Sequence, residues 1–149
     1  GYMLENGATT TWERWEYVDS GDQLGMASHD HPMNATVSAW FYRYLAGIRP
    51  TKPGFSEFTI MPFIPNDLNW AQATVKTVKG DIVLKWEKDG DSIKIIFNVP
   101  FNTECVLSLP NKFCDKTVSV NGETCSTFLS NNERFCFSFS SGDYTVIVE

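Results

Sequence analysis

The 149-residue sequence lacks several features that define common classes of protein. No run of about 18 apolar residues is present, so no membrane-spanning helix is expected. Lysine and arginine number 12 against 18 aspartates and glutamates, and no basic stretch gathers as nucleic-acid binding would require. There is no low-complexity tract and no repeat of fixed period. The remaining composition, 42% hydrophobic and 14% aromatic, is that of a globular chain with a real core.

An initiator methionine and a signal peptide are also absent, and residues 1–5 are typical of the interior of a chain. We therefore expect the sequence to be the C-terminal piece of a longer protein. The missing signal then carries no information on export. Periplasmic, extracellular and cytoplasmic locations all stay open.

The sequence has few residues that could bind a metal. Two histidines, His29 and His31, flank Asp30, but ligands at i and i+2 need an extended backbone and no third cluster accompanies them. The cysteines form no Cys-x-x-Cys pair and lie far from both histidines. We expect no metal and no cofactor. The four cysteines are Cys105, Cys114, Cys125 and Cys136.

The disulfide state of these cysteines stays open on sequence alone. An even number permits one or two disulfides if the protein is exported. Cys105, however, alternates with Leu107 and Leu109 in a strand-like run, which favours a buried free thiol.

One helix is predicted, over residues 37–46. Apolar residues recur at i, i+3, i+4, i+7 and i+8 from Val37, the spacing of one helical face. Asn34 has the position of an N-cap, Gly47 that of a C-cap, and Pro50 stops further winding. This stripe is expected to be core packing, either against a missing upstream helical domain or against the sheet that follows.

After a short linker at residues 51–54 the apolar period changes to two. Strands are predicted at 58–61, 73–78, 81–86, 92–99, 105–109, 117–120, 134–139 and 144–148, with turns at Lys79-Gly80, Asp89-Gly90 and Asn121-Gly122. Eight or so short strands with turns between them predict an antiparallel β-sandwich. The fold class is therefore mainly β, preceded by a helical segment.

Residues 7–16 contain an unusual mixture of side chains. They read Gly-Ala-Thr-Thr-Thr-Trp-Glu-Arg-Trp-Glu, with two indoles, two carboxylates and a guanidinium in the last five positions. Indoles suit the apolar faces of a pyranose, and carboxylates suit its hydroxyls and acid/base chemistry. A simpler interpretation is a helix start with Thr9 or Thr10 as N-cap and Glu13 as the capping-box partner of Thr10.

The same stretch resembles the Gly-Ala-Thr-Thr-x-Trp-Glu-Arg-Trp segment of the bacterial and fungal α-L-rhamnosidases. Residues 40–50, Trp-Phe-Tyr-Arg-Tyr-Leu-Ala-Gly-Ile-Arg-Pro, resemble the helix that follows it in that family. Pro53-Gly54-Phe55 and residues 58–62 resemble the entry to the family's C-terminal β-domain. The three motifs occur in the right order within about sixty residues.

The resemblance implies the end of a catalytic (α/α) barrel at residues 1–50 and a C-terminal β-sandwich at 55–149, which packs against the upstream barrel. It also implies an inverting glycosidase that cleaves terminal α-L-rhamnosyl bonds of a rhamnose-containing glycoside or polysaccharide. The general base of the family falls on Glu13, and a histidine that lines the sugar subsite falls on His31. The family more often has asparagine at position 30 and an aromatic residue at 29, where this sequence has Asp30 and His29.

Trp12 and Trp15 have two interpretations, as surfaces that stack on sugar or as core of the helical barrel. The family's general acid lies far upstream, so the isolated chain is expected to be close to inactive. Two alternatives remain: a non-catalytic carbohydrate-binding β-sandwich, favoured if Trp70 and Trp86 are exposed on a sheet face, and a structural domain that caps the barrel. The aglycone and the oligomeric state cannot be read from the sequence.

Overall fold

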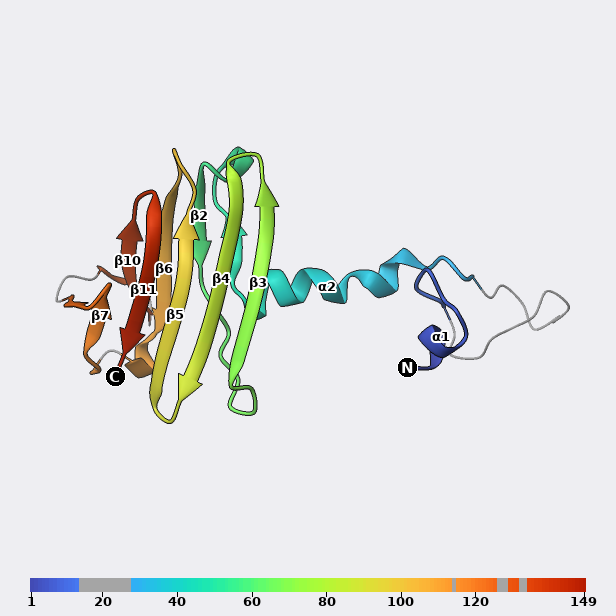
Figure 1. The fold of residues 1–149 in the computed structure, drawn as a ribbon, viewed down its shortest axis with the longest axis horizontal. Coiled ribbons are helices and arrows are strands. Elements are labelled where there is room, and N and C mark those ends of the chain that lie inside the picture. The colour runs from blue at the N-terminus through green and yellow to red at the C-terminus, as the bar shows by residue number, and fades with distance from the viewer. Residues whose placement is uncertain (14–27, 114, 126–128, 132–133) are drawn as a thin grey trace, which may run out of the picture. The chain divides into compact units, whose positions relative to one another are not determined.

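The structure is a computed structural model that describes residues 1–13, 28–113, 115–125, 129–131 and 134–149. The chain divides into two compact units, Gly1–Trp40 and Phe41–Glu149. Figure 1 traces both units in chain order. No helix among the described residues is long and apolar enough to span a membrane.

The described residues of the first unit form three short helical elements. They are α1 (Tyr2–Glu5), the 3-10 helix η1 (Pro32–Ala35) and α2 (Val37–Trp40). Pro32 occupies the first position of η1, where its missing N–H costs no hydrogen bond, and His31 is the N-cap. Asn34 lies inside η1, so the prediction that it caps the helix is wrong. Its amide bonds to another segment instead, as described below.

The second unit begins with the π-helix η2 (Phe41–Leu45), in which the Ala46 N–H donates to the Phe41 carbonyl at 2.9 Å. The helix predicted over 37–46 is confirmed from 37 to 45, but its type changes from α to π at Phe41. Of the apolar stripe, Leu45 packs against the core that follows, whereas Val37, Trp40 and Phe41 are exposed.

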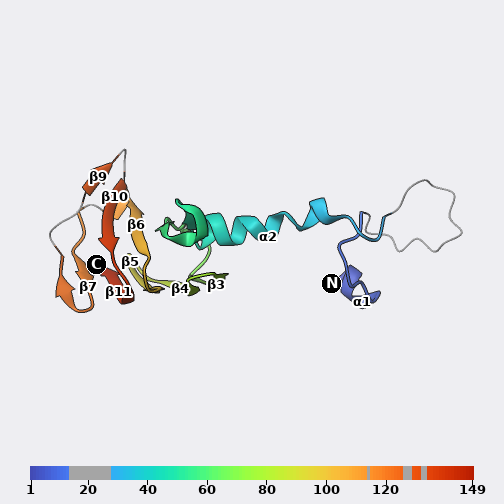
Figure 2. The same ribbon diagram turned by 90° about the horizontal axis from the view of Figure 1, so that it is seen from above.

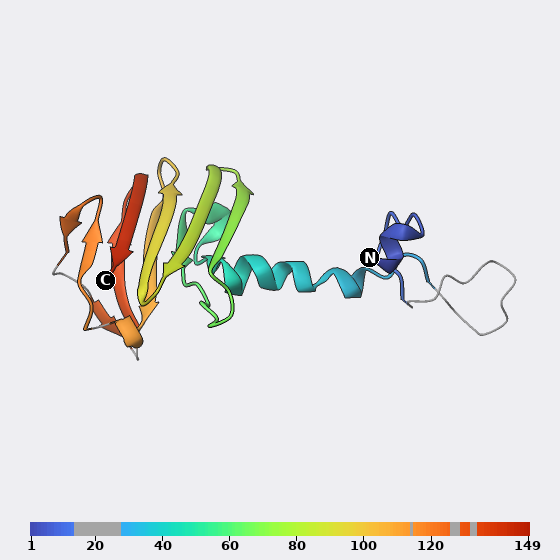
Figure 3. The ribbon, with the colours of Figure 1, turned by 60° about the horizontal axis from the view of Figure 1, so that its bottom comes forward.

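The strands described in the second unit form two sheets. The first contains β1 (Ile48–Pro50), β2 (Glu57–Ile60), β6 (Glu104–Pro110), β10 (Arg134–Phe139) and β9 (Leu129–Asn131), in that spatial order. The second contains β3 (Trp70–Thr77), β4 (Gly80–Asp89), β5 (Ser92–Val99), β11 (Gly142–Val148), β7 (Val118–Val120) and β8 (Glu123–Thr124). Figures 2 and 3 show the two layers and the strand order of the second sheet.

The strand pairs of the described residues are antiparallel except β2 with β6, which run parallel. This confirms the predicted sandwich and its eight strands. β1, β8 and β9, each of two or three residues, were not predicted. The predicted Asn121-Gly122 turn is present, and both residues have positive φ, as a tight hairpin requires. The other two hairpin turns lie one residue away from their predicted positions, at Val78-Lys79 and at Gly90-Asp91.

The core lies between the two sheets. Alternate residues of each long strand point inward, as the period of two requires. Trp86 has no exposed surface, and Ile82 and Leu84 of the same strand are equally buried. Facing them from the other sheet are the fully buried Phe58 and Leu107.

The end of η2 is joined to the sandwich by hydrogen bonds between distant residues. Trp86 Nε1 donates to the Leu45 carbonyl at 3.0 Å, and the Phe63 N–H donates to the Tyr44 carbonyl at 2.8 Å. The Gly47 carbonyl accepts from the Met61 N–H at 2.9 Å. These bonds occupy carbonyls at the helix end that would otherwise lack intrahelical donors.

Gly47 is required at this junction. Its φ of 80° is left-handed, as expected of a residue that ends a helix, and a Cβ at this position would lie 2.2 Å from the Met61 carbonyl carbon. Only a residue without a side chain allows the two backbones to approach so closely.

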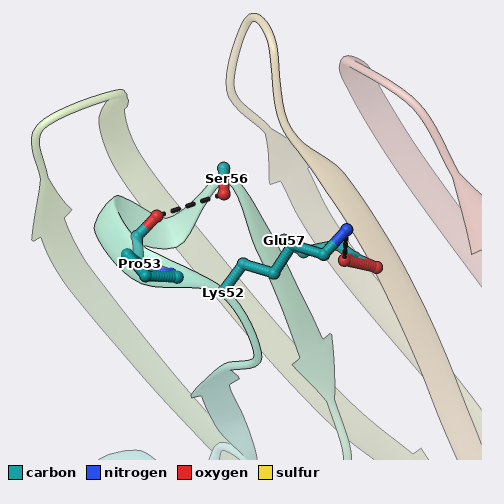
Figure 4. Close-up of polar contacts among 4 residues, drawn as sticks. All are labelled: Lys52, Pro53, Ser56 and Glu57. Atoms are coloured by element: carbon teal, nitrogen blue, oxygen red, sulfur yellow. Dashed lines mark hydrogen bonds and ion pairs between the residues drawn. The ribbon is translucent and has the colours of Figure 1, made fainter.

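The predicted linker at residues 51–54 overlaps the 3-10 helix η3 (Pro53–Phe55). Ser56 Oγ donates to the Pro53 carbonyl at 3.1 Å, and Lys52 forms an ion pair with Glu57 across the turn (Figure 4). A second 3-10 helix, η4 (Asn111–Phe113), follows β6.

Among the cysteines, Cys105 is completely buried, which confirms the thiol predicted on β6. Burial raises its pKa to about 12, because the thiolate cannot be solvated there. Cys136 is also a thiol, and its Sγ lies 3.5 Å from Ser108 Oγ. Cys114 lies outside the described residues.

Candidate functional site

The residues that the motif singled out lie where two segments of the first unit run side by side. Residues 10–13 pair with residues 28–34 through hydrogen bonds over long sequence separations. The Glu13 N–H donates to the Ser28 carbonyl at 2.9 Å, and the His31 N–H donates to the Thr11 carbonyl at 2.8 Å. Thr11 Oγ1 donates in return to the His31 carbonyl at 2.9 Å.

Glu13 is held by Ser28 from two directions. Besides the bond between their main chains, the Ser28 N–H donates to Glu13 Oε2 at 3.1 Å. The Ser28 side chain is used locally, since its Oγ donates to the Asp30 carbonyl at 2.9 Å and accepts from the Asp30 N–H at 3.1 Å. The exposed carboxylate of Glu13 is therefore oriented by a main-chain donor that is itself fixed in a turn.

Trp12 is the buried residue of this site, with 4% of its surface exposed. Its ring stacks on that of His29, with centroids 4.7 Å apart and planes 20° from parallel. Asn34 Nδ2 donates to the Trp12 carbonyl at 3.1 Å. Burial favours the packing interpretation of Trp12 over a surface that stacks on sugar.

His31 lies beside this pair of segments and is partly buried. Its Nε2 is 2.9 Å from Met33 Sδ. The main chain of His31 is hydrogen-bonded to Thr11, the residue that precedes Trp12. His31 therefore lies close in the structure to the segment that carries Trp12 and Glu13. Trp15 falls outside the described residues.

The capping-box interpretation of residues 9–13 is not supported. Residues 11–13 are not helical, and the Thr10 hydroxyl donates to the His29 carbonyl, not to the Glu13 N–H. The Thr10 and Glu13 side chains instead bond to the second segment.

Sequence reasoning missed three contributors to the site: Ser28, His29 and Asn34. Ser28 acts through its main chain, which no side-chain pattern reveals. His29 lies at the surface, and its stacking on Trp12 was not predicted. Within the described part of the chain, no three His, Cys, Asp or Glu side chains gather as a metal site would need.

The two tryptophans named for a sugar-binding sheet face differ sharply. Trp86 is fully buried in the core and cannot serve that role, whereas Trp70 is 58% exposed at the start of β3. The observation that would favour a carbohydrate-binding module therefore holds for Trp70 alone.

The described fold is that of a short helical segment followed by a two-sheet β-sandwich. Residues 47–124 match the family model for the "Bacterial alpha-L-rhamnosidase C-terminal domain", and residues 1–45 match that for the family's "6 hairpin glycosidase domain". The chain belongs to the bacterial α-L-rhamnosidase family.

Individual relatives agree with this assignment. The chain is 38% identical to an α-L-rhamnosidase of Alteromonas sp. (strain LOR) over 104 residues, which is 68% of this chain and 11% of that protein. Its structure is similar to that of an α-L-rhamnosidase of Dictyoglumus thermophilum, with a TM-score of 0.83, 35% identity and coverage of 100% of this chain and 17% of that one.

A Streptomyces avermitilis α-L-rhamnosidase, whose crystal structure is complexed with L-rhamnose, is also similar. Its TM-score is 0.78 at 25% identity, over 100% of this chain and 14% of that chain. The present chain thus spans less than a fifth of the length of each relative.

Proposed function

We propose that this chain is the C-terminal part of an inverting α-L-rhamnosidase in which Glu13 is the general base. In such a reaction one carboxylic acid protonates the leaving oxygen while a carboxylate deprotonates the attacking water, the two about 6.5–9.5 Å apart. The single observation that carries the proposal is the exposed Glu13 carboxylate held by the Ser28 N–H at 3.1 Å. A general base needs this combination of access and fixed orientation.

The neighbouring residues take supporting roles in this proposal. His31 lines the sugar subsite, and Trp15 supplies apolar surface to it. Trp12 is buried and supports the segment that carries Glu13 through its stacking on His29. The substrate is a glycoside or polysaccharide with a terminal α-L-rhamnosyl group, and the reaction needs no cofactor.

We place the end of the catalytic (α/α) barrel at residues 1–50 and the C-terminal sandwich at 55–149. The upstream barrel covers the helical segment and supplies the general acid. Large apolar side chains along that segment support this arrangement: Met33 and Val37 are more than half exposed, and Tyr42 is 44% exposed. Exposed apolar surface of this kind marks a contact with another part of a protein.

The test is the Glu13→Gln variant in the full-length enzyme. Glutamine keeps the size and hydrogen bonding of glutamate but cannot take the proton from water. We expect kcat for an aryl rhamnoside to fall by about 10²–10⁴, with a much smaller change in KM. An activated leaving group should not restore the rate because the attack step has failed, whereas added azide should, as an external nucleophile.

Glu16→Gln is the matched control, because Glu16 lies in the same motif but does not match the family's base. It should keep most of its activity. Near-normal activity of Glu13→Gln, or a larger loss in Glu16→Gln, would show that the base has been assigned to the wrong residue. The 149-residue chain alone should show no turnover of the same substrate.

A further inference from the structure

The outer face of the second sheet carries a regular array of side chains. Four strands, β3, β4, β5 and β11, lie next to one another in this sheet (Figures 1 and 3). The strand registers place outward-facing residues in rows that cross all four strands. The first row is Trp70, Glu87, Lys94 and Ile147, and the second is Gln72, Lys85, Ile96 and Thr145.

Two adjoining grooves follow these rows. A groove of about 470 Å³ covers the first row, from Trp70 on β3 to Ile147 on β11. A neighbouring groove of about 440 Å³ covers the second row and continues to Asn98 and Asp143. Three inter-strand spacings separate β3 from β11, so each row is roughly 14 Å long. That length suits an extended ligand lying across the strands.

Trp70 supplies a flat apolar wall at one end of the first groove. It belongs to β3, the edge strand of the sheet, and more than half of its surface is exposed. Ile96 and Val83, two further apolar side chains of the face, are each about 40% exposed. Pyranose rings bury their C–H faces on indole in just such a position.

The charges of the grooves are mixed and largely paired. Lys85 and Glu87 form an ion pair on β4. Lys88 Nζ is already bonded to the carbonyls of Pro65 and Asn66, at 2.7 and 3.0 Å. No field of one sign remains among these described residues to attract an anion or a cation. The grooves instead offer amide, hydroxyl, ammonium and carboxylate groups beside apolar surface, which suits a neutral polyhydroxylated ligand.

We propose that these two grooves form a non-catalytic binding site for a neutral oligosaccharide, with one sugar ring stacked on Trp70. Gln72, Lys94 and Glu87 would bond to its hydroxyls. The site lies in the sandwich, uses none of the residues assigned to the reaction, and goes beyond the proposed rhamnosidase activity. Its role would be to hold a polysaccharide substrate on the enzyme between cleavage events.

The test uses the 149-residue chain and two probes, L-rhamnose and a soluble uncharged rhamnose-containing oligosaccharide, followed by calorimetry and by saturation-transfer NMR. We expect the oligosaccharide to bind more tightly than the monosaccharide. Trp70→Ala should weaken it about tenfold or more, through loss of the apolar contact. Phe101→Ala is the matched control: Phe101 is 87% exposed in the turn between β5 and β6, outside both grooves.

Absence of binding to both probes at millimolar concentration, or equal losses in the two variants, would overturn the proposal. Unchanged unfolding midpoints will show that both variants fold. In the full-length enzyme, Trp70→Ala should keep kcat on a small aryl rhamnoside but turn over a polysaccharide more slowly. A full-length Trp70→Ala variant that is destabilised but binds sugar normally would overturn the proposal too, and would identify the face as an internal interface. Because Glu13→Gln does not touch the grooves, failure of either proposal leaves the other standing.

Discussion

The two units of the chain are stabilised in different ways. Among the described residues of the first unit, Trp12 is the one buried side chain, and the rest of the structure rests on hydrogen bonds between residues 10–13 and 28–34. The second unit buries more than twenty apolar side chains between its two sheets. Hydrogen bonds contribute about 1 kcal/mol each, whereas a buried Leu or Phe contributes about 1.5–3 kcal/mol. We therefore expect the sandwich to be stable by itself, whereas the unit that carries the candidate base should not be stable alone.

Among the variants that test this contrast, Trp86→Ala should cause the largest loss of stability. The change removes a completely buried indole and the Nε1–H that donates to the Leu45 carbonyl at 3.0 Å. We expect the free energy of unfolding of the sandwich to fall by about 3–5 kcal/mol, measured by urea denaturation followed by far-UV circular dichroism. Trp12→Ala is the comparison, and it should leave the same midpoint nearly unchanged. Equal losses in the two variants would show that the units unfold as one.

Gly47→Ala should have the next largest effect. The new Cβ would lie 2.2 Å from the Met61 carbonyl carbon while φ is 80°. A strained backbone of this kind costs about 1–3 kcal/mol, and the steric clash adds to it. Gly90→Ala is the matched control, because Gly90 has a φ of 58° but a Cβ added there would meet no atom within 4 Å. Equal losses of stability in urea for the two variants would show that the close approach to Met61 is not the reason for glycine at position 47.

The ionisation of Cys105 should have a smaller effect on the free energy of unfolding, and this effect should change gradually with pH. Its pKa is raised to about 12 in the folded protein, so the thiol stays protonated there while the unfolded chain ionises near pH 9. The folded state binds more protons, so this contribution is complete below pH 9 and is lost as the pH rises toward 12, by at most about 1.4 kcal/mol per pH unit. The measurement is the difference in urea midpoint between the chain and Cys105→Ala as a function of pH.

A thiol titration completes this prediction. Cys105 should not react in the folded protein, and all four cysteines should react after unfolding without reductant. Fewer than four would reveal a disulfide among the cysteines and an oxidising compartment. A folded-state reaction at Cys105 would contradict its burial.

Much of the second unit could be predicted from the sequence because its signals are local. The period of two predicted the strand at 81–86, which places Leu84 and Trp86 on one face, and both are buried in the core. The Asn121-Gly122 pair correctly placed a hairpin turn. β1 was missed because it has three residues, ends in Pro50 and is defined only by its pairing with β2. The change from α-helix to π-helix at Phe41 likewise leaves no mark in the apolar spacing.

The candidate site was harder to predict in detail. The residue types around Glu13 and the family resemblance drew attention to the right segment. The bond from the Ser28 main chain to Glu13, however, joins residues 15 positions apart and involves no side chain of Ser28. The stacking of Trp12 on His29 likewise joins residues at a distance in sequence that no helical or strand period spans. Tertiary pairing of two loops thus decides which motif residues face solvent.

The hydrogen bond between Trp86 and Leu45 has a consequence for folding during translation. Forty-one positions separate the donor from the acceptor, so the ribosome delivers the helix end well before the strand that completes it. In a growing chain, the Leu45 carbonyl therefore lacks this donor until β4 has emerged and folded. A gene shortened before β4 would lose more than a peripheral module, because the Leu45 carbonyl would lack the Trp86 donor. Exchange of sandwiches between related enzymes is constrained for the same reason, since any replacement must place a hydrogen-bond donor at that carbonyl.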